Sequence, residues 1–157
     1  MQIAHNSLVM VADGRKMMLL RNEGDADYPN LEVVKVEIQD NPADREQGTD
    51  RPGRTFQASD GPVRQNGSAA TGHRSAYSET DIHQLEEDRF AATAAEMLNR
   101  RALRGEVETL VVVAPPTTLG ELRKHYHKNL AERIAAELPK DLTGHPVDQI
   151  ERIITAA

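Results

Sequence analysis

The chain has 157 residues with a formal net charge of -6 and 38% hydrophobic residues, which is enough for one domain with a core of its own. It contains no cysteine, which excludes disulfides, thiolate nucleophiles and zinc held by cysteine. The acidic balance argues against a generally basic nucleic-acid binder but leaves room for a local basic face. No apolar run approaches the roughly 20 residues that span a bilayer, and the start lacks the pattern of a secretory leader. We therefore predict a soluble, cytoplasmic protein without membrane insertion.

Two short apolar runs near the start predict a β-hairpin. They cover residues 7–12 and 16–21 and flank Asp13-Gly14, a pair that favours a tight turn with positive φ at both positions. A third run at residues 31–38 alternates apolar and polar side chains over its second half, which predicts a strand with one buried face. We expect the three strands to form an antiparallel meander.

Residues 39–80 differ in composition from the rest of the chain. They hold five of the ten glycines and three of the eight prolines and hardly any aliphatic side chain, which predicts a long flexible loop within a single domain of residues 1–157. In this loop Arg51 and Arg54 lie close to Phe56, and two arginines beside an aromatic ring can clamp a phosphate or a base. Alternatively, Phe56 attaches the loop to the domain while the arginines stay in water.

A helix is predicted after this loop, from Asp81 with Gln84 as its capping partner to about Leu103, before a glycine that suits a left-handed exit. Its predicted core face consists of Leu85, Phe90, Ala94, Met97 and Leu98. The continuous apolar run at residues 110–114 is typical of a strand covered on both faces and predicts the centre of the sheet.

Pro115 and Pro116 end that strand, and a long amphipathic helix is predicted to follow, with Thr117 or Thr118 capping its first turn. The apolar face of this helix comprises Leu119, Leu122, Tyr126, Leu130 and Ile134. Around residues 134–138 the pattern also allows a short fifth strand. A terminal helix at residues 147–156 turns Ile150, Ile153 and Ile154 inward.

This order of elements predicts an α/β domain. We expect a mixed sheet of four to five strands, three antiparallel and one or two parallel, with helices on its faces. The order resembles that of the ribonuclease H-like fold.

The start of the predicted long helix is the best candidate for a binding site. A helix that begins just past the carboxyl end of a buried strand presents free amides and a positive dipole end to an anion. Further along lies a set of cations that we call the cationic ledge: Arg123, Lys124, His127 and Lys128. Together with Thr117, Thr118, Arg51 and Arg54, the ledge is predicted to bind the phosphates of RNA or of a nucleotide. The alternative is an ordinary solvated face, with Glu121 and Glu132 nearby for pairing.

Catalytic patterns are missing from the chain. A nuclease of ribonuclease H type needs converging carboxylates, and Asp13 with Glu86 or Glu87 finds no third acid at the end of the central strand. His125 and His127 are two residues apart, whereas zinc on a helix favours a spacing of four. Serine hydrolase, P-loop and dinucleotide motifs are also missing. We therefore predict no catalytic residue, no metal and no cofactor.

Several blocks of the chain together resemble the bacterial host-attachment protein family, whose members are required for attachment to host cells. They include Val-Ala-Asp-Gly-Arg at residues 11–15, Asp-Arg-Pro-Gly-Arg at 50–54, residues 81–83 and 87–91, Leu-Val-Val-Val-Ala-Pro-Pro at 110–116, residues 120–125, Lys-Asp-Leu-Thr at 140–143 and His-Pro at 145–146. That family is grouped with bacterial relatives of the archaeo-eukaryotic release factors. The resemblance implies a ribonuclease H-like fold and contact with ribosomes. The Gly-Gly-Gln tripeptide of the release factors is absent, since no two glycines are adjacent.

Two functional hypotheses follow from the sequence. The first is a non-enzymatic protein, similar to host-attachment proteins, that binds the ribosome or other RNA through the ledge and the arginine-containing loop. The second is an enzyme on phosphorylated or nucleotide substrates, with residues 39–80 as a lid over the helix start. Adhesion at the cell surface is a third possibility, which the lack of an export signal disfavours.

Overall fold

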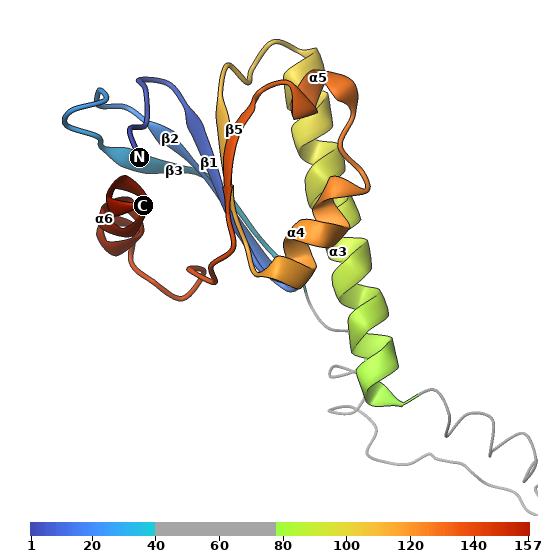
Figure 1. Ribbon diagram of the computed structural model, residues 1–157. Helices are drawn as coiled ribbons and strands as arrows, with labels where there is room; N and C mark the ends of the chain where they lie inside the picture. Colours follow the sequence, from blue (N-terminus) through green and yellow to red (C-terminus); the bar gives the residue numbers. More distant parts are fainter. Residues whose placement is uncertain (40–77) are drawn as a thin grey trace, which may run out of the picture. The chain divides into compact units, whose positions relative to one another are not determined.

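The structure is a computed structural model that describes residues 1–39 and 78–157. Residues 1–39 and 88–157 form one compact unit, and residues 78–87 belong to a second unit. The helices and strands, labelled in Figure 1, are β1 Leu8–Ala12, β2 Lys16–Asn22, β3 Leu31–Ile38, α3 Glu79–Leu103, β4 Leu110–Val113, α4 Pro116–Arg123, α5 Lys128–Ala131, β5 Ile134–Leu138 and α6 Val147–Ala156. No helix in the described part of the chain is both long and apolar enough to cross a membrane.

The five strands form one sheet in the order β3-β2-β1-β4-β5. The neighbours β1 and β2, and β2 and β3, are antiparallel, whereas β4 runs parallel to β1 and β5 parallel to β4. This confirms the predicted mixed α/β sheet and its fifth strand. The strand order is compatible with a ribonuclease H-like arrangement, which stays a prediction.

The hairpin between β1 and β2 is present, but its turn differs from the predicted one. Among the described residues, positive φ occurs at Asn6 and Gly105, so the expected positive φ at Asp13 and Gly14 is wrong. Instead, Oδ1 of Asp13 accepts hydrogen bonds from the amides of Arg15 and Lys16, at 2.7 and 2.8 Å. The aspartate side chain thus closes the turn, which is why this residue type favours such positions.

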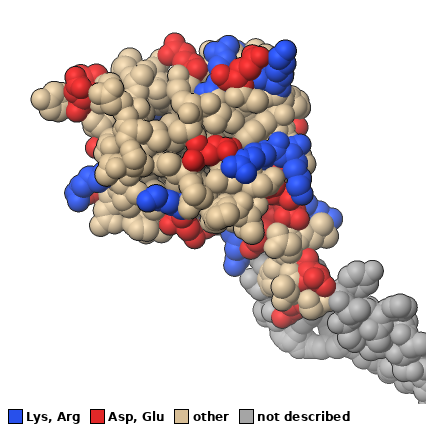
Figure 2. Space-filling model, viewed as in Figure 1, with Lys and Arg blue, Asp and Glu red and all other residues tan. Residues whose placement is uncertain are grey.

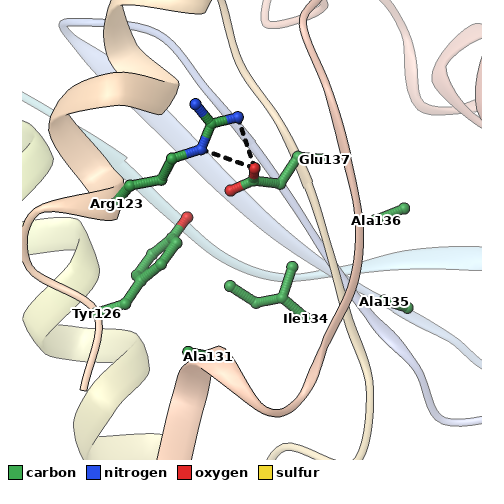
Figure 3. A pocket seen from close by; sticks show the side chains of 7 residues that line it. All are labelled: Arg123, Tyr126, Ala131, Ile134, Ala135, Ala136 and Glu137. Carbon is green, nitrogen blue, oxygen red and sulfur yellow. Dashed lines mark hydrogen bonds and ion pairs between the residues drawn. The ribbon is translucent and has the colours of Figure 1, made fainter. Parts of the chain in front are cut away.

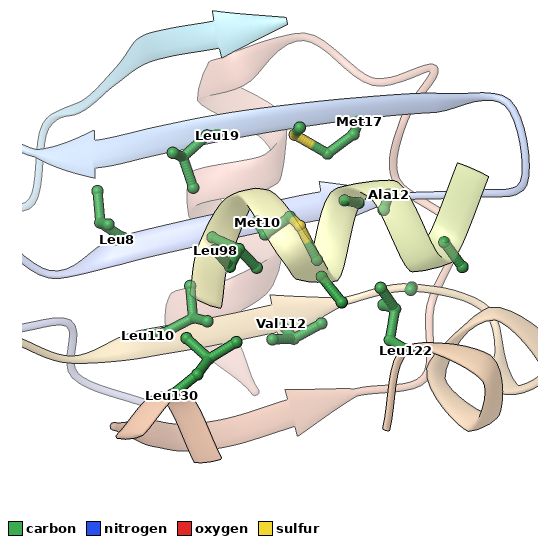
Figure 4. Packing of buried hydrophobic residues seen from close by; sticks show 14 of the residues in the cluster. Leu8, Met10, Ala12, Met17, Leu19, Leu98, Leu110, Val112, Leu122 and Leu130 are labelled. Carbon is green, nitrogen blue, oxygen red and sulfur yellow. The ribbon is translucent and has the colours of Figure 1, made fainter. Parts of the chain in front are cut away.

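Both faces of the sheet are buried under helices. Figure 1 shows α3, α4 and α5 on one face and α6 on the other. Alternate β1 residues point to opposite faces, as a strand requires. One core, which we call the α3-side core, includes Leu8, Met10, Ala12, Met17, Leu19, Leu98, Leu110, Val112, Leu122 and Leu130 (Figure 4). The other, the α6-side core, includes Val9, Val11, Leu20, Val113, Ile150 and Ile154, which confirms the inward face predicted for the terminal helix.

The predicted buried face of β3 is wrong. Val36 and Ile38 are exposed, because β3 is an edge strand of the sheet. The pairing with β2 also shifts between Leu19 and Leu20. Val34 is the extra residue at this shift and packs half-buried against the α3-side core, whereas Val36, opposite Met18, lies on the α6 side.

Helix α3 begins before the predicted start. Its first residue is Glu79, and the Ser78 hydroxyl accepts a hydrogen bond from the Asp81 amide at 3.2 Å, so Ser78 is the cap rather than Asp81. Gly105, with φ of 75°, ends the helix, and the amide of Glu106 donates to the carbonyl of Arg101 at 2.9 Å, as in a Schellman motif. Of the predicted core face, Phe90, Ala94 and Leu98 are buried, whereas Leu85 is exposed. The predicted loop of residues 39–80 lies mostly outside the described residues, and its last two residues are helical.

Candidate functional site

Helix α4 begins directly after β4, at the carboxyl end of the parallel strands. Pro115 is the N-cap, with φ of -59° and ψ of 156°, and no side chain caps the first turn, so the predicted threonine cap is wrong. Pro116 follows as the first helical residue, where a missing N–H costs nothing. Thr117 is exposed and Thr118 half-exposed, which leaves the helix start open to solvent.

The predicted long helix is in fact two helices, α4 and α5. Between them, the buried Asn99 of α3 accepts a hydrogen bond from the amide of His127 and donates one to the carbonyl of His125, both at 2.9 Å. A continuous helix needs the His127 amide for its own bond to the residue four positions earlier. Here the His127 amide donates to Asn99 instead, and α4 does not continue into α5. The expectation that the helix reaches Ile134 is therefore wrong, since Ile134 begins β5.

The cationic ledge lies around the end of α4 and the start of α5, and each of its first three members faces a carboxylate. Both Nε and a terminal nitrogen of Arg123 donate to Oε1 of Glu137 on β5, at 2.8 and 2.7 Å. Lys124 pairs with Glu121 at 3.0 Å, and His127 lies 3.8 Å from Glu96 of α3. Arg123 and Lys124 are thus ion-paired, and the three side chains face acids on three different elements, β5, α4 and α3.

Lys128 is the exposed first residue of α5 and makes no ion pair within residues 1–39 and 78–157. Figure 2 shows lysine and arginine side chains interspersed with acidic ones on the face in view, without a broad basic patch. Thr117 and Thr118 lie at the other end of α4, roughly 10 Å along the helix axis from Lys124 at 1.5 Å per residue. The four ledge residues thus lie near one another along the chain, three of them turn toward different elements, and the two threonines lie at the other end of α4.

A shallow pocket of about 360 Å³ lies beside Arg123, between α4, α5 and β5. Its lining consists of Arg123, Tyr126, Ala131, Ile134, Ala135, Ala136 and Glu137 (Figure 3). The Arg123–Glu137 pair forms the polar end and the alanines and Ile134 form the apolar end. Sequence reasoning missed this pocket because it placed Tyr126 only on the apolar face of a helix and gave Glu137 no role.

The Tyr126 hydroxyl is the unusual polar group of this pocket. It is buried and has no hydrogen-bond partner among the described residues. Figure 3 shows it directed toward the Arg123–Glu137 pair. Burial, with the nearby charge of Glu137 as a second cause, raises the pKa of Tyr126. Like any tyrosine, it is neutral at physiological pH, and its hydroxyl can donate a hydrogen bond.

A second polar cluster joins β1 to the segment after β5. The Thr143 hydroxyl lies 2.7 Å from Oδ2 of Asp13 and 3.0 Å from Oδ1 of Asp141, and Nζ of Lys16 donates to the Thr143 carbonyl at 3.3 Å. Two of the sequence blocks that carry the family resemblance, residues 11–15 and 140–143, therefore meet here. The sequence explained Asp13 by its turn alone, and no local signal connects it with a threonine 130 residues away.

The remaining predicted site residues are less informative. Arg51 and Arg54, and most of the lid proposed for an enzyme, lie outside the described residues. His125 faces Glu121 at 3.7 Å, whereas His127 faces Glu96, so the two histidines point to different neighbours. Within the described residues, no three histidine or acidic side chains gather as a metal site.

The fold and the site together describe an α/β protein whose candidate site is an exposed surface of paired charges beside a shallow pocket. The chain belongs to bacterial archaeo-eukaryotic release factor family 12, whose family model matches residues 6–154. This confirms the predicted relation to the bacterial relatives of the release factors. The relation to host-attachment proteins stays a prediction.

A search of the curated proteins finds no match to this chain. Among solved structures, the chain is similar to one described as an archaeal protein, with 11% sequence identity and a TM-score of 0.48. That match covers 96% of this chain and 33% of the archaeal chain, so this chain spans about a third of that protein's length.

Proposed function

We propose that this protein is a non-enzymatic binding protein that contacts ribosomal or other RNA through the cationic ledge. The family match carries the proposal, because it relates almost the whole chain to the release factors. The resemblance to those proteins implies contact with ribosomes. The proposal includes no peptidyl-tRNA hydrolysis, because the chain lacks the Gly-Gly-Gln tripeptide.

The ion pairs of the ledge are compatible with RNA binding. They lie at the surface, where the side chains of Arg123 and Lys124 are 56% and 68% exposed. Exposed ion pairs stabilise a fold only slightly, because water and salt screen them. Glu137 and Glu121 are only 20% and 18% exposed, so they stay in place while an RNA phosphate approaches the open sides of Arg123 and Lys124. Lys128, which has no ion pair among the described residues, extends the same surface by one more donor.

A salt series with a fluorescent single-stranded RNA tests this contact. We expect the affinity to fall steeply as salt rises, because bound phosphates release counterions. The double variant Lys124→Ala with Lys128→Ala should bind more weakly and lower the slope of log affinity against log salt by about 0.7 to 1 per lost cation.

Two controls make the test specific to the ledge. Lys124→Arg with Lys128→Arg keeps both charges and should bind like the original chain. Arg152→Ala removes an exposed cation from α6, on the other face of the sheet, and should change binding little. A flat salt response, or an equal loss in all three variants, would contradict the proposal.

A pull-down from native cell lysate, with and without ribonuclease, identifies the partner. Ribosomal proteins and RNA should be captured together, and ribonuclease treatment should release them. Capture that survives ribonuclease would instead point to a direct protein partner.

Host attachment belongs to the proposal only as an indirect effect of this RNA contact. We expect the protein in the cytoplasmic fraction of disrupted cells. Its recovery at the cell surface would favour direct adhesion and contradict this part of the proposal.

A further inference from the structure

Strand β3 is an edge strand that exposes three apolar side chains. Val33, Val36 and Ile38 are 48%, 45% and 69% exposed, although β3 is the longest strand of the sheet. Long edge strands with exposed apolar side chains tend to pair with another strand, and proteins usually protect them. This surface is independent of the cationic ledge and of the pocket beside it.

The outer edge of β3 is protected at its first residue. The amide of Leu31 donates to Oε2 of Glu151 on α6, at 2.8 Å. Beyond that point, β3 pairs with β2 on its inner side and with no strand on its outer side, as far as the described residues show. Within residues 1–39 and 78–157, the segment from Glu32 to Ile38 therefore has an outer edge free for a further strand.

The charges on β3 specify which strand fits best. Lys35 and Glu37 pair with Leu19 and Met17 of β2, so both side chains lie on the α3 side of the sheet, 3.1 Å apart. Val36, between them, lies on the opposite face. Around Val36 the sequence thus reads cation, apolar, anion, and an antiparallel copy of the same segment reads in the reverse order.

We propose that a second copy of this chain pairs with β3, antiparallel and edge to edge, about a two-fold axis at Val36. In this register, Lys35 of each copy lies directly opposite Glu37 of the other copy, and the two Val36 side chains face each other. A two-fold interface requires such reciprocity, since residue i must meet j and j must meet i. The two sheets then continue into one.

Neighbouring registers fit less well. An axis at Lys35 would place two lysines directly opposite each other, and an axis at Glu37 would do the same with two glutamates. Like charges directly opposite on neighbouring strands are destabilising, whereas opposite charges stabilise the pair. The charge pattern therefore selects Val36 as the centre and favours a second copy over an unrelated strand.

Sedimentation velocity of the full chain over a concentration series tests the proposal. We expect a reversible monomer–dimer equilibrium. Lys35→Glu alone and Glu37→Lys alone should each weaken the dimer by about tenfold or more, because each places like charges opposite in two symmetric positions. An equimolar mixture of the two variants should form a mixed dimer, since the two acids of the Lys35→Glu copy then lie opposite the two lysines of the Glu37→Lys copy.

The mixture separates pairing from folding, because each variant keeps its own like-charge repulsion within the strand. Val36→Lys should abolish the dimer, whereas Leu103→Lys, a matched change of an exposed apolar residue on α3, should leave it intact. A chain that stays monomeric at every concentration would overturn the proposal. So would a dimer that tolerates Val36→Lys, or a mixture that behaves like its separate components.

Discussion

The Asn99 side chain holds the backbone between α4 and α5. It is buried on α3 and bonds to the backbone of His125 and His127. Leaving such backbone groups without a partner costs about 1 to 3 kcal/mol per group. We expect Asn99→Ala to lower the free energy of unfolding by roughly 2 to 4 kcal/mol in urea denaturation. Asn129→Ala, at an exposed position on α5, should stay within about 0.5 kcal/mol of the original chain.

For Tyr126 we expect no loss of stability when its polar group is removed, in contrast to Asn99. Its buried hydroxyl has no hydrogen-bond partner among the described residues. Removing an unpaired polar group is nearly neutral or stabilising. We therefore expect Tyr126→Phe to be as stable as the original chain at pH 7, or more stable by up to about 1 kcal/mol. A clear loss of stability would show that the hydroxyl has a partner in solution.

The raised pKa of Tyr126 adds a pH dependence. Its pKa in the folded chain lies above that in the unfolded chain, where tyrosine titrates near about pH 10. Above that pH the unfolded state loses its proton first, so this residue's contribution to stability is present below about pH 10 and declines as pH rises. Urea denaturation between pH 7 and pH 11 should show a smaller decline for Tyr126→Phe. Tyr28→Phe, at an exposed position, should decline like the original chain.

At the scale of elements, local patterns predicted much of the scaffold. The strands at residues 31–38 and 134–138 and the terminal helix lie where their apolar patterns placed them. Leu119, Leu122 and Leu130 do face the same core, as the helical period predicted. The helical period of residues 117–134 carries no information about Asn99, which lies on α3. Asn99 accepts a hydrogen bond from the His127 amide, and the predicted single helix is two helices at this point.

The candidate site was less predictable because its contacts also join residues that are far apart in the sequence. The sequence places cations on the ledge, but their carboxylate partners come from elsewhere, as when Arg123 meets Glu137 across 14 residues. Likewise, the segment containing Thr143 reaches Asp13 only because β5 is added beside β4. Contacts that depend on the order of strands leave no mark in local composition.

The Thr143 hydroxyl fastens the segment after β5 to the turn after β1. A hydrogen bond to a charged group contributes about 1.5 to 3 kcal/mol. We expect Thr143→Val, which keeps the shape but removes the hydroxyl, to lower the free energy of unfolding by that amount in urea denaturation. Thr143→Ser keeps the donor and should lose much less. A loss in Thr143→Ser without a loss in Thr143→Val would assign the effect to packing of the methyl group instead.

At the scale of the whole unit formed by residues 1–39 and 88–157, two cores share one sheet. On the α6 side, α6 is the covering helix, and its Ile150 and Ile154 are fully buried. Because β1 contributes alternate residues to both cores, loss of one core removes support from the other. We therefore expect this unit to unfold in a single transition.

Ile154→Ala tests this coupling. Truncation of a fully buried isoleucine costs about 2 to 5 kcal/mol, through lost transfer free energy and the cavity left behind. The half-buried neighbour Ile153 is the matched control and should lose roughly 1 kcal/mol as alanine. Thermal unfolding followed by circular dichroism and by calorimetry should give one coincident transition in both variants. If Ile154→Ala produced a separate early transition, α6 would be a layer that unfolds on its own, and the two cores would be independent despite their common strands.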